Sequence, residues 1–85
     1  MVHTYSLMMK ARNGTYSPAG FFDVQDASIR LLGALGYEAE TCFDGNIQTG
    51  RKLDDLVVGA LEMTAMRYRG IPVDIRYMGE TSQII

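Results

Sequence analysis

The chain has 85 residues, enough for one small domain over residues 1–85 whose single core leaves little stability to spare. Hydrophobic residues make up 47% of it and charged residues 21%, an ordinary balance for a globular protein. The formal net charge of −2 gives no overall attraction to nucleic acid or to an anionic membrane, so neither is expected as a partner.

The first strand is predicted over residues 3–10. Alternate residues in this segment are apolar, at the period of two that is typical of a strand with one buried face: Tyr5, Leu7 and Met9. Asn13-Gly14 follows the segment and marks a turn.

The first helix is predicted to begin at Ser17 and to run to about residue 35. The Ser17 hydroxyl can accept a backbone N–H of the first turn, and Pro18 suits the first helical position because an N–H there would have no partner. Gly36 is the expected stop. Residues at helical spacing support this helix: Phe21, Val24, Ser28, Leu31 and Leu35, with Ala27 and Leu32 beside them.

A hairpin is predicted next. Residues 37–44 alternate as a strand, and Asp44-Gly45 is a strong hairpin signal that leads to a short returning strand over residues 46–49. One face of the first of these strands carries Tyr37, Ala39, Thr41 and Phe43.

The second helix is predicted over residues 53–69, and Gly70 ends it. Acidic residues in its first turn and basic residues in its last turn both suit the helix dipole. Its expected apolar face consists of Leu53, Leu56, Val57, Ala60, Leu61 and Met63 or Thr64. A last strand is predicted over residues 71–79, at an edge or starting at Pro72. The six methionines of the chain are interpreted as core residues, with a methionine-rich binding surface as the alternative.

The predicted order is strand-helix-strand-strand-helix-strand, or βαββαβ. Two helices on one face of an antiparallel sheet make an α+β fold, an open-faced β-sandwich.

This order and one short motif resemble HPr, the phosphocarrier family of the bacterial sugar phosphotransferase system. The segment Gly14-Thr15-Tyr16-Ser17-Pro18-Ala19-Gly20 stands where HPr proteins carry the signature of the phosphoacceptor histidine. Downstream, Val24-Gln25-Asp26-Ala27-Ser28 resembles the family's "VQxAS" in the first helix, without a gap between the two motifs. The resemblance extends more weakly over roughly residues 4–80.

The chain departs from HPr at the residues that perform its chemistry. Tyr16 stands at the histidine position, Pro18 at the position of an arginine that helps to hold the phosphoryl group, and Lys52 at that of the regulatory serine. A tyrosine phosphoester is far more stable than a phosphohistidine, so Tyr16 is not expected to pass a phosphoryl group on. The resemblance therefore implies a cytoplasmic, non-enzymatic binding or regulatory module with no cofactor, which contacts a protein partner through its helix face.

Two candidate surfaces follow from this resemblance. Tyr16, Ser17 and Ala19 would place backbone N–H groups at a helix start, a candidate anion site, although an ordinary capped helix explains the same residues. Arg12, Arg51 and Lys52 are the candidate partner surface, since basic residues lie near the helix starts on the HPr partner-binding face; a solvated face is the alternative.

A second interpretation is a generic split-βαβ domain of the ferredoxin-like kind, serving as a subunit or as a ligand- or RNA-binding domain. The RNA-binding version predicts aromatic side chains on the open face of the sheet, supplied by Tyr5, Tyr37, Phe43 and Tyr77. A working phosphocarrier would need another residue in the histidine's role, such as His3.

The remaining reactive residue types give no further site. Cys42 is the single cysteine, which excludes an internal disulfide, and no activating partner is visible beside it. Glu38, Glu40 and Asp44 share a strand face, but no histidine stands near them, so no metal site is predicted.

Overall fold

The computed structural model describes residues 1–19, 21–42 and 44–81. Seven elements follow one another: β1 (Val2–Lys10), β2 (Tyr16–Pro18), α1 (Phe22–Ala34), β3 (Ala39–Thr41), β4 (Ile47–Thr49), α2 (Asp55–Arg69) and β5 (Val73–Thr81). The predicted α+β class, with an antiparallel sheet and two helices, is confirmed. The order of elements differs from the predicted βαββαβ, because a further strand, β2, precedes α1.

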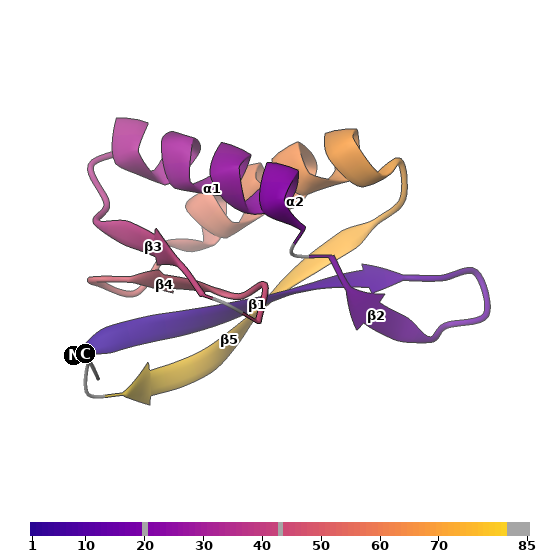
Figure 1. The fold of residues 1–85 in the computed structure, drawn as a ribbon, viewed down its shortest axis with the longest axis horizontal. Helices are drawn as coiled ribbons and strands as arrows, with labels where there is room; N and C mark the ends of the chain where they lie inside the picture. Colours follow the sequence, from indigo (N-terminus) through magenta and orange to yellow (C-terminus); the bar gives the residue numbers. More distant parts are fainter. Residues whose placement is uncertain (20, 43, 82–85) are drawn as a thin grey trace.

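The long strand β1 lies at the centre of the sheet. One of its edges pairs with β5 along almost its whole length, with Tyr5 opposite Tyr77. Its other edge is divided between two short strands: β4 pairs with the first half, where Ile47 lies opposite Tyr5, and β2 pairs with the second half, where Ser17 lies opposite Met9. The strand β3 pairs with the outer side of β4, so the sheet runs β5, β1, β4, β3 (Figure 1).

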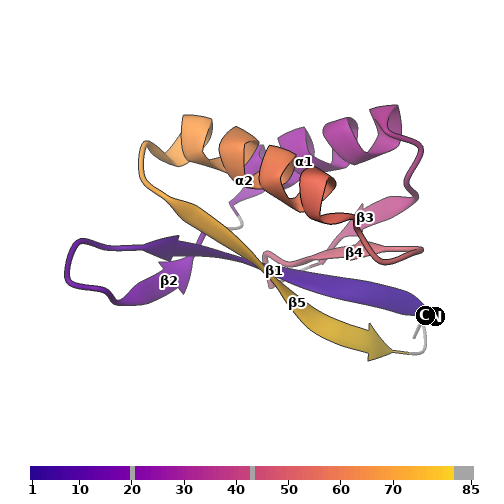
Figure 2. The ribbon, with the colours of Figure 1, turned by 180° about the vertical axis from the view of Figure 1, so that it is seen from behind.

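Both helices lie on the same face of this sheet, as predicted (Figures 1 and 2). In the chain, β2 and then α1 stand between β1 and β3, and in the sheet β4 lies between those two strands. The helix α2 connects β4 to β5, and β1 lies between them. Each helix therefore belongs to a βαβ unit whose two strands are separated by a third.

The prediction that Ser17 caps the first helix is wrong. The helix α1 begins at Phe22 with Phe21 as its N-cap residue, and Ser17 lies upstream in β2. The Asn13-Gly14 turn closes a hairpin, with Gly14 at φ 83°, and this hairpin lays residues 16–18 along β1. Strand pairing satisfies the backbone groups that a longer helix would also have satisfied, so the local preference of Ser17-Pro18 for a helix start is overridden.

The core lies between the helices and the sheet, and both layers contribute to it: Tyr5, Leu7, Ala19, Val24, Leu32, Tyr37, Ile47, Leu53, Leu61, Ala65, Val73 and Ile75. Tyr5 also joins the layers by a hydrogen bond, since its hydroxyl accepts the backbone N–H of Leu53 at 2.8 Å. Gly45 and Gly70 have positive φ angles of 94° and 70°, as expected of the predicted hairpin turn and helix stop.

The "VQxAS" motif has a structural role in this core. The Gln25 side chain is buried in α1, and its Nε2 donates to the carbonyl oxygens of Cys42 and Asn46 at 3.0 and 3.1 Å. These two residues flank the β3–β4 turn, so Gln25 ties α1 to the hairpin. Val24 and Ser28 are fully buried beside it.

The predicted apolar face of the second helix is partly wrong. Leu61 and Ala65 are buried and Val57 packs on the core, but Leu56 is 89% exposed and Met63 is 57% exposed. This helix carries apolar residues on all sides, so their spacing alone does not show which side meets the sheet. The interpretation of the methionines as core residues is also wrong for four of the six: Met1, Met63, Met66 and Met78 are exposed.

Candidate functional site

The first candidate, the anion site at Tyr16, Ser17 and Ala19, does not lie at a helix start. Tyr16 and Ser17 lie in β2, and the backbone N–H of Ala19 is donated to the carbonyl oxygen of Leu7 at 2.8 Å. Gly20, the last residue of the motif, is outside the described residues. A cradle of N–H groups at a helix N-terminus, on which the predicted site depends, is therefore not formed by these residues.

The Tyr16 ring instead lies among basic side chains on the sheet face opposite the helices. The guanidinium of Arg76 is 4.1 Å from the ring centroid, and the ammonium group of Lys10 is 6.0 Å from it. These cation–π contacts join Tyr16 of β2 to Lys10 of β1 and to Arg76 of β5.

The second candidate, the partner surface at Arg12, Arg51 and Lys52, is not assembled. Arg51 and Lys52 follow β4, whose Thr49 lies opposite His3 near the start of β1, whereas Arg12 follows the end of β1. At about 3.3 Å per strand residue, the length of β1 separates them by more than about 20 Å. Each cation near α2 stacks on its own ring: Arg51 lies 3.9 Å from the centroid of Tyr37, and Lys52 lies 4.7 Å from that of Tyr77.

A small aromatic cluster lies at this end of the sheet. The Nδ1 atom of His3 is 2.8 Å from the Tyr77 hydroxyl, the two rings stack, and Tyr5 packs against Tyr77 from within. Burial raises the pKa of the Tyr5 hydroxyl, although its bond with the Leu53 N–H acts in the opposite direction. Tyr5 therefore stays protonated at neutral pH and serves as a structural link. The alternation of apolar residues in both long strands indicated which of their residues share a face, but the register that pairs Tyr5 with Tyr77 could not be predicted from it.

The aromatic residues that the RNA-binding interpretation placed on the open sheet face do not lie there. Tyr5 and Tyr37 are buried in the core, and Tyr77 shares the helix-facing side of the sheet with Tyr5. Phe43 lies outside the described residues. The sheet face opposite the helices thus lacks the aromatic platform formed by these tyrosines that stacking on bases requires.

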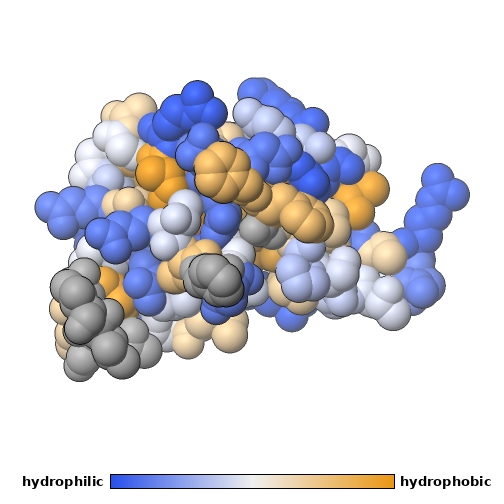
Figure 3. Space-filling view, viewed as in Figure 1, coloured by the Kyte–Doolittle hydropathy of each residue, from blue (hydrophilic) through white to orange (hydrophobic). Residues whose placement is uncertain are grey.

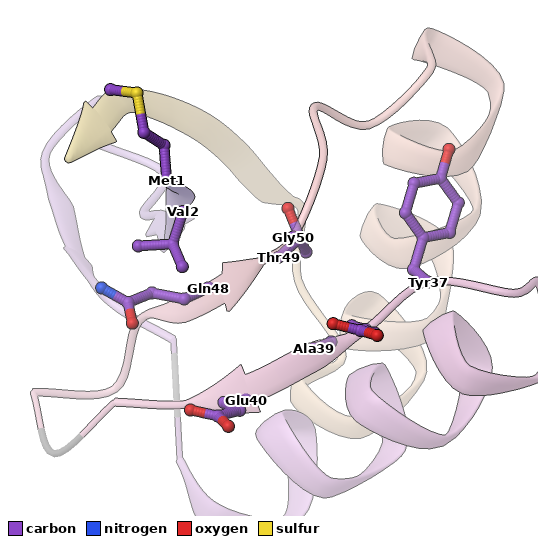
Figure 4. A pocket seen from close by; sticks show the side chains of 9 residues that line it. Met1, Val2, Tyr37, Ala39, Glu40, Gln48, Thr49 and Gly50 are labelled. Carbon is purple, nitrogen blue, oxygen red and sulfur yellow. The ribbon is translucent and has the colours of Figure 1, made fainter. Parts of the chain in front are cut away.

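A hollow with a volume of about 570 Å³ lies between the N-terminus and the β3–β4 edge (Figure 4). Met1, Val2, Glu38, Glu40 and Gln48 are among the residues that line it. Carboxylates and an amide surround an open space there, and the described lining residues include neither a histidine nor a cysteine. Among the described residues, no group of three histidine, cysteine or acidic side chains is placed to hold a metal ion.

Cys42 is not poised for chemistry. Burial raises the pKa of its thiol, and the nearby carboxylates of Asp44 and Glu40 raise it further. The thiolate, which is the nucleophilic form, is therefore scarce at neutral pH.

The outer face of α2 is the most extended apolar surface on one element. Leu56 is 89% exposed, Met63 57% and Met66 42%, and these residues stand at helical spacing with Gly59 between them. We call Leu56, Gly59, Met63 and Met66 the α2 stripe. Figure 2 shows α2 as the nearer helix. Within the described chain no element packs over this side of the helix, which is opposite to the buried Leu61 and Ala65.

A smaller apolar area lies at the start of α1, where Phe21 and Phe22 are exposed. Apolar atoms gather there between hydrophilic ones in Figure 3. The area is confined to one helix turn, and the guanidinium of Arg69, which pairs with Asp23, lies 4.8 Å from the Phe21 ring centroid. The α2 stripe, which extends over three turns, is therefore the stronger candidate for a binding surface.

No helix in the described ranges is both long and apolar enough to cross a membrane. No protein-family model matches this chain, and neither curated proteins nor solved structures include a match to it.

Proposed function

We propose that this chain is a non-catalytic interaction domain of the split-βαβ kind, which binds a protein partner through the α2 stripe. The observation that carries the proposal is the exposure of Leu56, Met63 and Met66 on one side of α2, while the other side forms the core. Leu56 in particular adds little to the packing of the domain itself, since 89% of it is exposed. Large apolar residues that gather in one exposed area are typical of a binding surface, and methionine adapts its shape to a partner.

The strand order supports the split-βαβ interpretation over the HPr-like one. The strand β4 is inserted in the unit β1–α1–β3, and β1 is inserted in the unit β4–α2–β5. The anion site that the HPr resemblance implied depended on a helix start at Ser17, which lies in β2. Both interpretations share the expectation of a module that acts through its helix layer, and the α2 stripe is on that layer.

The chemistry of the exposed groups supports a non-catalytic function. The thiol of Cys42 has a raised pKa, and the Tyr16 ring is held between Arg76 and Lys10. We expect no acid-labile phosphate on the protein after incubation with phosphoenolpyruvate and Enzyme I. Intact-mass spectrometry in alkaline solution measures this, and stoichiometric addition of one phosphoryl group would reject the non-catalytic assignment.

Photo-crosslinking tests the binding surface. A benzophenone amino acid replaces Met63 in one variant and Met78 in a control; both methionines are exposed, but Met78 lies in β5. We expect a crosslinked adduct in cells from position 63 and none from position 78. The partner in the adduct, once purified, should bind the Met78→Glu variant as it binds the natural protein and should bind Met63→Glu at least about tenfold more weakly. Equal adducts at both positions, or none at position 63, would contradict the proposal.

A further inference from the structure

We propose that the sheet face opposite the helices forms a second binding surface, which takes an acidic segment of a partner protein. Its cationic groups belong to Lys10, Arg12 and Arg76, which we call the hairpin cations. This surface is distinct from the α2 stripe and goes beyond the proposed function, since it lies on the other layer of the domain. A domain with both surfaces can join two partners.

Strand pairing brings the hairpin cations together from separate parts of the chain. Lys10, at the end of β1, lies opposite Tyr16 of β2, and Arg76 comes from β5, on the other side of β1. Lys10 and Arg76 alternate along their strands with residues of the core, so their side chains point away from the helices. Arg12 is exposed in the turn, two residues beyond Lys10. Three positive charges thus gather at one end of the sheet, although the net charge of the chain is −2.

The Tyr16 ring positions two of these cations. The guanidinium of Arg76 lies 4.1 Å from the ring centroid, and the ammonium group of Lys10 lies 6.0 Å from it. Contact with a ring attracts a cation but leaves its N–H donors available to a carboxylate. Because the ring already restricts both side chains, they lose less conformational entropy when a ligand binds.

No carboxylate in the described ranges neutralises the hairpin cations. The single ion pair among the described residues joins Arg69 to Asp23, and both of these belong to the helix layer. Asp74 lies two residues before Arg76 on the same face of β5, but it forms no ion pair with any of the three. The hairpin therefore presents uncompensated positive charge, which attracts an acidic partner.

The hairpin that carries this surface is accessible. In Figures 1 and 2 the turn between β1 and β2 extends beyond the ends of both helices. At the tip of the hairpin, Oδ1 of Asn13 accepts the backbone N–H of Thr15 at 3.1 Å and the hydroxyl of Thr15 at 2.7 Å. These bonds hold the turn in shape, so Arg12 is presented on a defined loop.

The number of cations favours an acidic peptide over a nucleic acid. Three cations match the carboxylates of a short segment rich in aspartate and glutamate, whereas a nucleic-acid site often neutralises about 6–10 phosphates. The Tyr16 ring, which could otherwise stack on a base, already stacks against the Arg76 guanidinium. That guanidinium can in turn bind a carboxylate through two parallel hydrogen bonds.

We expect weak binding that is sensitive to salt. All three hairpin cations are exposed, and exposed ion pairs are individually weak and are screened by salt. The dissociation constant for a short acidic peptide should lie between about 0.1 and 1 mM in about 0.1 M salt. Raising the salt concentration to about 1 M should weaken the complex at least about fivefold.

An NMR titration with an oligoglutamate peptide tests the proposal. The isotope-labelled natural chain is titrated to about 5 mM peptide, which covers the expected range of dissociation constants. Backbone amide signals should shift over residues 8–18 and 74–78, and the signals of α2 should stay in place. An oligoglutamine peptide of the same length, which has no carboxylate side chains, should cause no shifts.

Charge reversal identifies the residues that bind. Arg12→Glu and Arg76→Glu should each weaken binding at least about fivefold, since each replaces an attraction by a repulsion. Arg12 lies outside the strands, so its variant keeps the strand pairing even if Arg76→Glu disturbs the Tyr16 contact. The matched control Arg30→Glu makes the same charge change at an exposed position of α1 and should alter the dissociation constant less than about twofold. Circular dichroism melting checks that each variant is folded.

The proposal is overturned if the oligoglutamate peptide does not bind, or if Arg30→Glu weakens binding as much as Arg12→Glu does. A DNA single strand of the same length that binds more tightly than the peptide would reject the acidic segment as the ligand. The Met63→Glu variant should bind the peptide as the natural chain does, because Met63 belongs to the helix layer. Failure of the α2 stripe as a binding surface therefore leaves this result unchanged, and a loss of peptide binding in Met63→Glu would contradict a separate surface.

Discussion

Removing the Glu62 carboxylate should destabilise the free edge of the sheet. The strand β5 pairs with β1 alone among the described strands, so backbone groups along its outer edge have no strand partner. Glu62 of α2 reaches this edge and accepts the N–H of Ile75 at 2.9 Å. In the Glu62→Ala variant that N–H loses its acceptor, and a hydrogen bond to a charged group contributes about 1.5–3 kcal/mol.

We take the lower end of that range, because the contact is only partly buried and alanine has the higher helix propensity. The free energy of unfolding should fall by about 1.5 kcal/mol, and the melting temperature of a domain this small by about 6–12 °C. Urea unfolding followed by circular dichroism measures the change, and the m-value should stay constant.

Glu62→Gln is the matched control. It keeps an oxygen that can accept the Ile75 N–H but removes the charge, so about half of the loss is expected. A Glu62→Ala variant whose stability changes by less than about 0.3 kcal/mol would show that the carboxylate does not hold this edge.

Three further predictions concern stability. Ser17→Ala should change the free energy of unfolding, measured in urea, by less than about 0.5 kcal/mol, because Ser17 is an exposed strand residue. Leu32→Ala in the core should lower it by about 3 kcal/mol. A loss of about 1 kcal/mol in Ser17→Ala would restore the helix-cap interpretation. Gly70→Ala should destabilise the domain by about 1 kcal/mol, since Gly70 has φ 70°. Gly33→Ala, inside α1 with open space around it, should stabilise the domain by about 0.5 kcal/mol. Melting temperatures of the two variants that shift in the same direction would contradict this. The raised pKa of Tyr5 means that the folded state holds its proton more tightly than the unfolded state, so its contribution is complete below about pH 10, the ordinary tyrosine value, and is lost as the pH rises through the folded pKa. Urea melts should therefore show stability falling above about pH 10, and less steeply in Tyr5→Phe.

The second helix and the hairpin could be predicted because their signals are local. Gly70 stops α2, and Gly45 forms the β3–β4 turn with a positive φ, as the sequence indicated. The start of α1 could not be predicted in this way. Ser17-Pro18 has the residues of a typical helix cap, but the Asn13-Gly14 turn brings it back along β1, where it pairs as a strand instead. Asn13-Gly14 is itself typical of a hairpin turn, but the helix-cap pattern at Ser17-Pro18 favoured a helix start.

The HPr resemblance implied a partner surface on the helix layer, but the residues that it named there were Arg12, Arg51 and Lys52, and none of them belongs to the α2 stripe. Leu56 and Met63 were expected in the core, and their exposure became visible only when the buried side of α2 was known. When apolar residues lie around the whole circumference of a helix, their spacing does not show which side is buried. The hydrogen bond from Ile75 to Glu62 was equally hidden, since it depends on which edge of the sheet stays open.

The position of β1 sets the order in which the domain can be assembled during translation. The strand made first needs β5, made last among the described elements, along one entire edge: Tyr5 pairs with Tyr77, across almost the whole sequence. Before β5 is made, the β1–β2 and β3–β4 hairpins have all of their residues, but the central strand remains open on that edge. Contacts so distant in sequence form slowly, since a long loop must close before they stabilise anything. Until β5 arrives, Leu7 and Met9 lack their neighbours Ile75 and Val73 on that strand, and the unfinished edge is the point at which a chaperone, or another nascent chain, would bind.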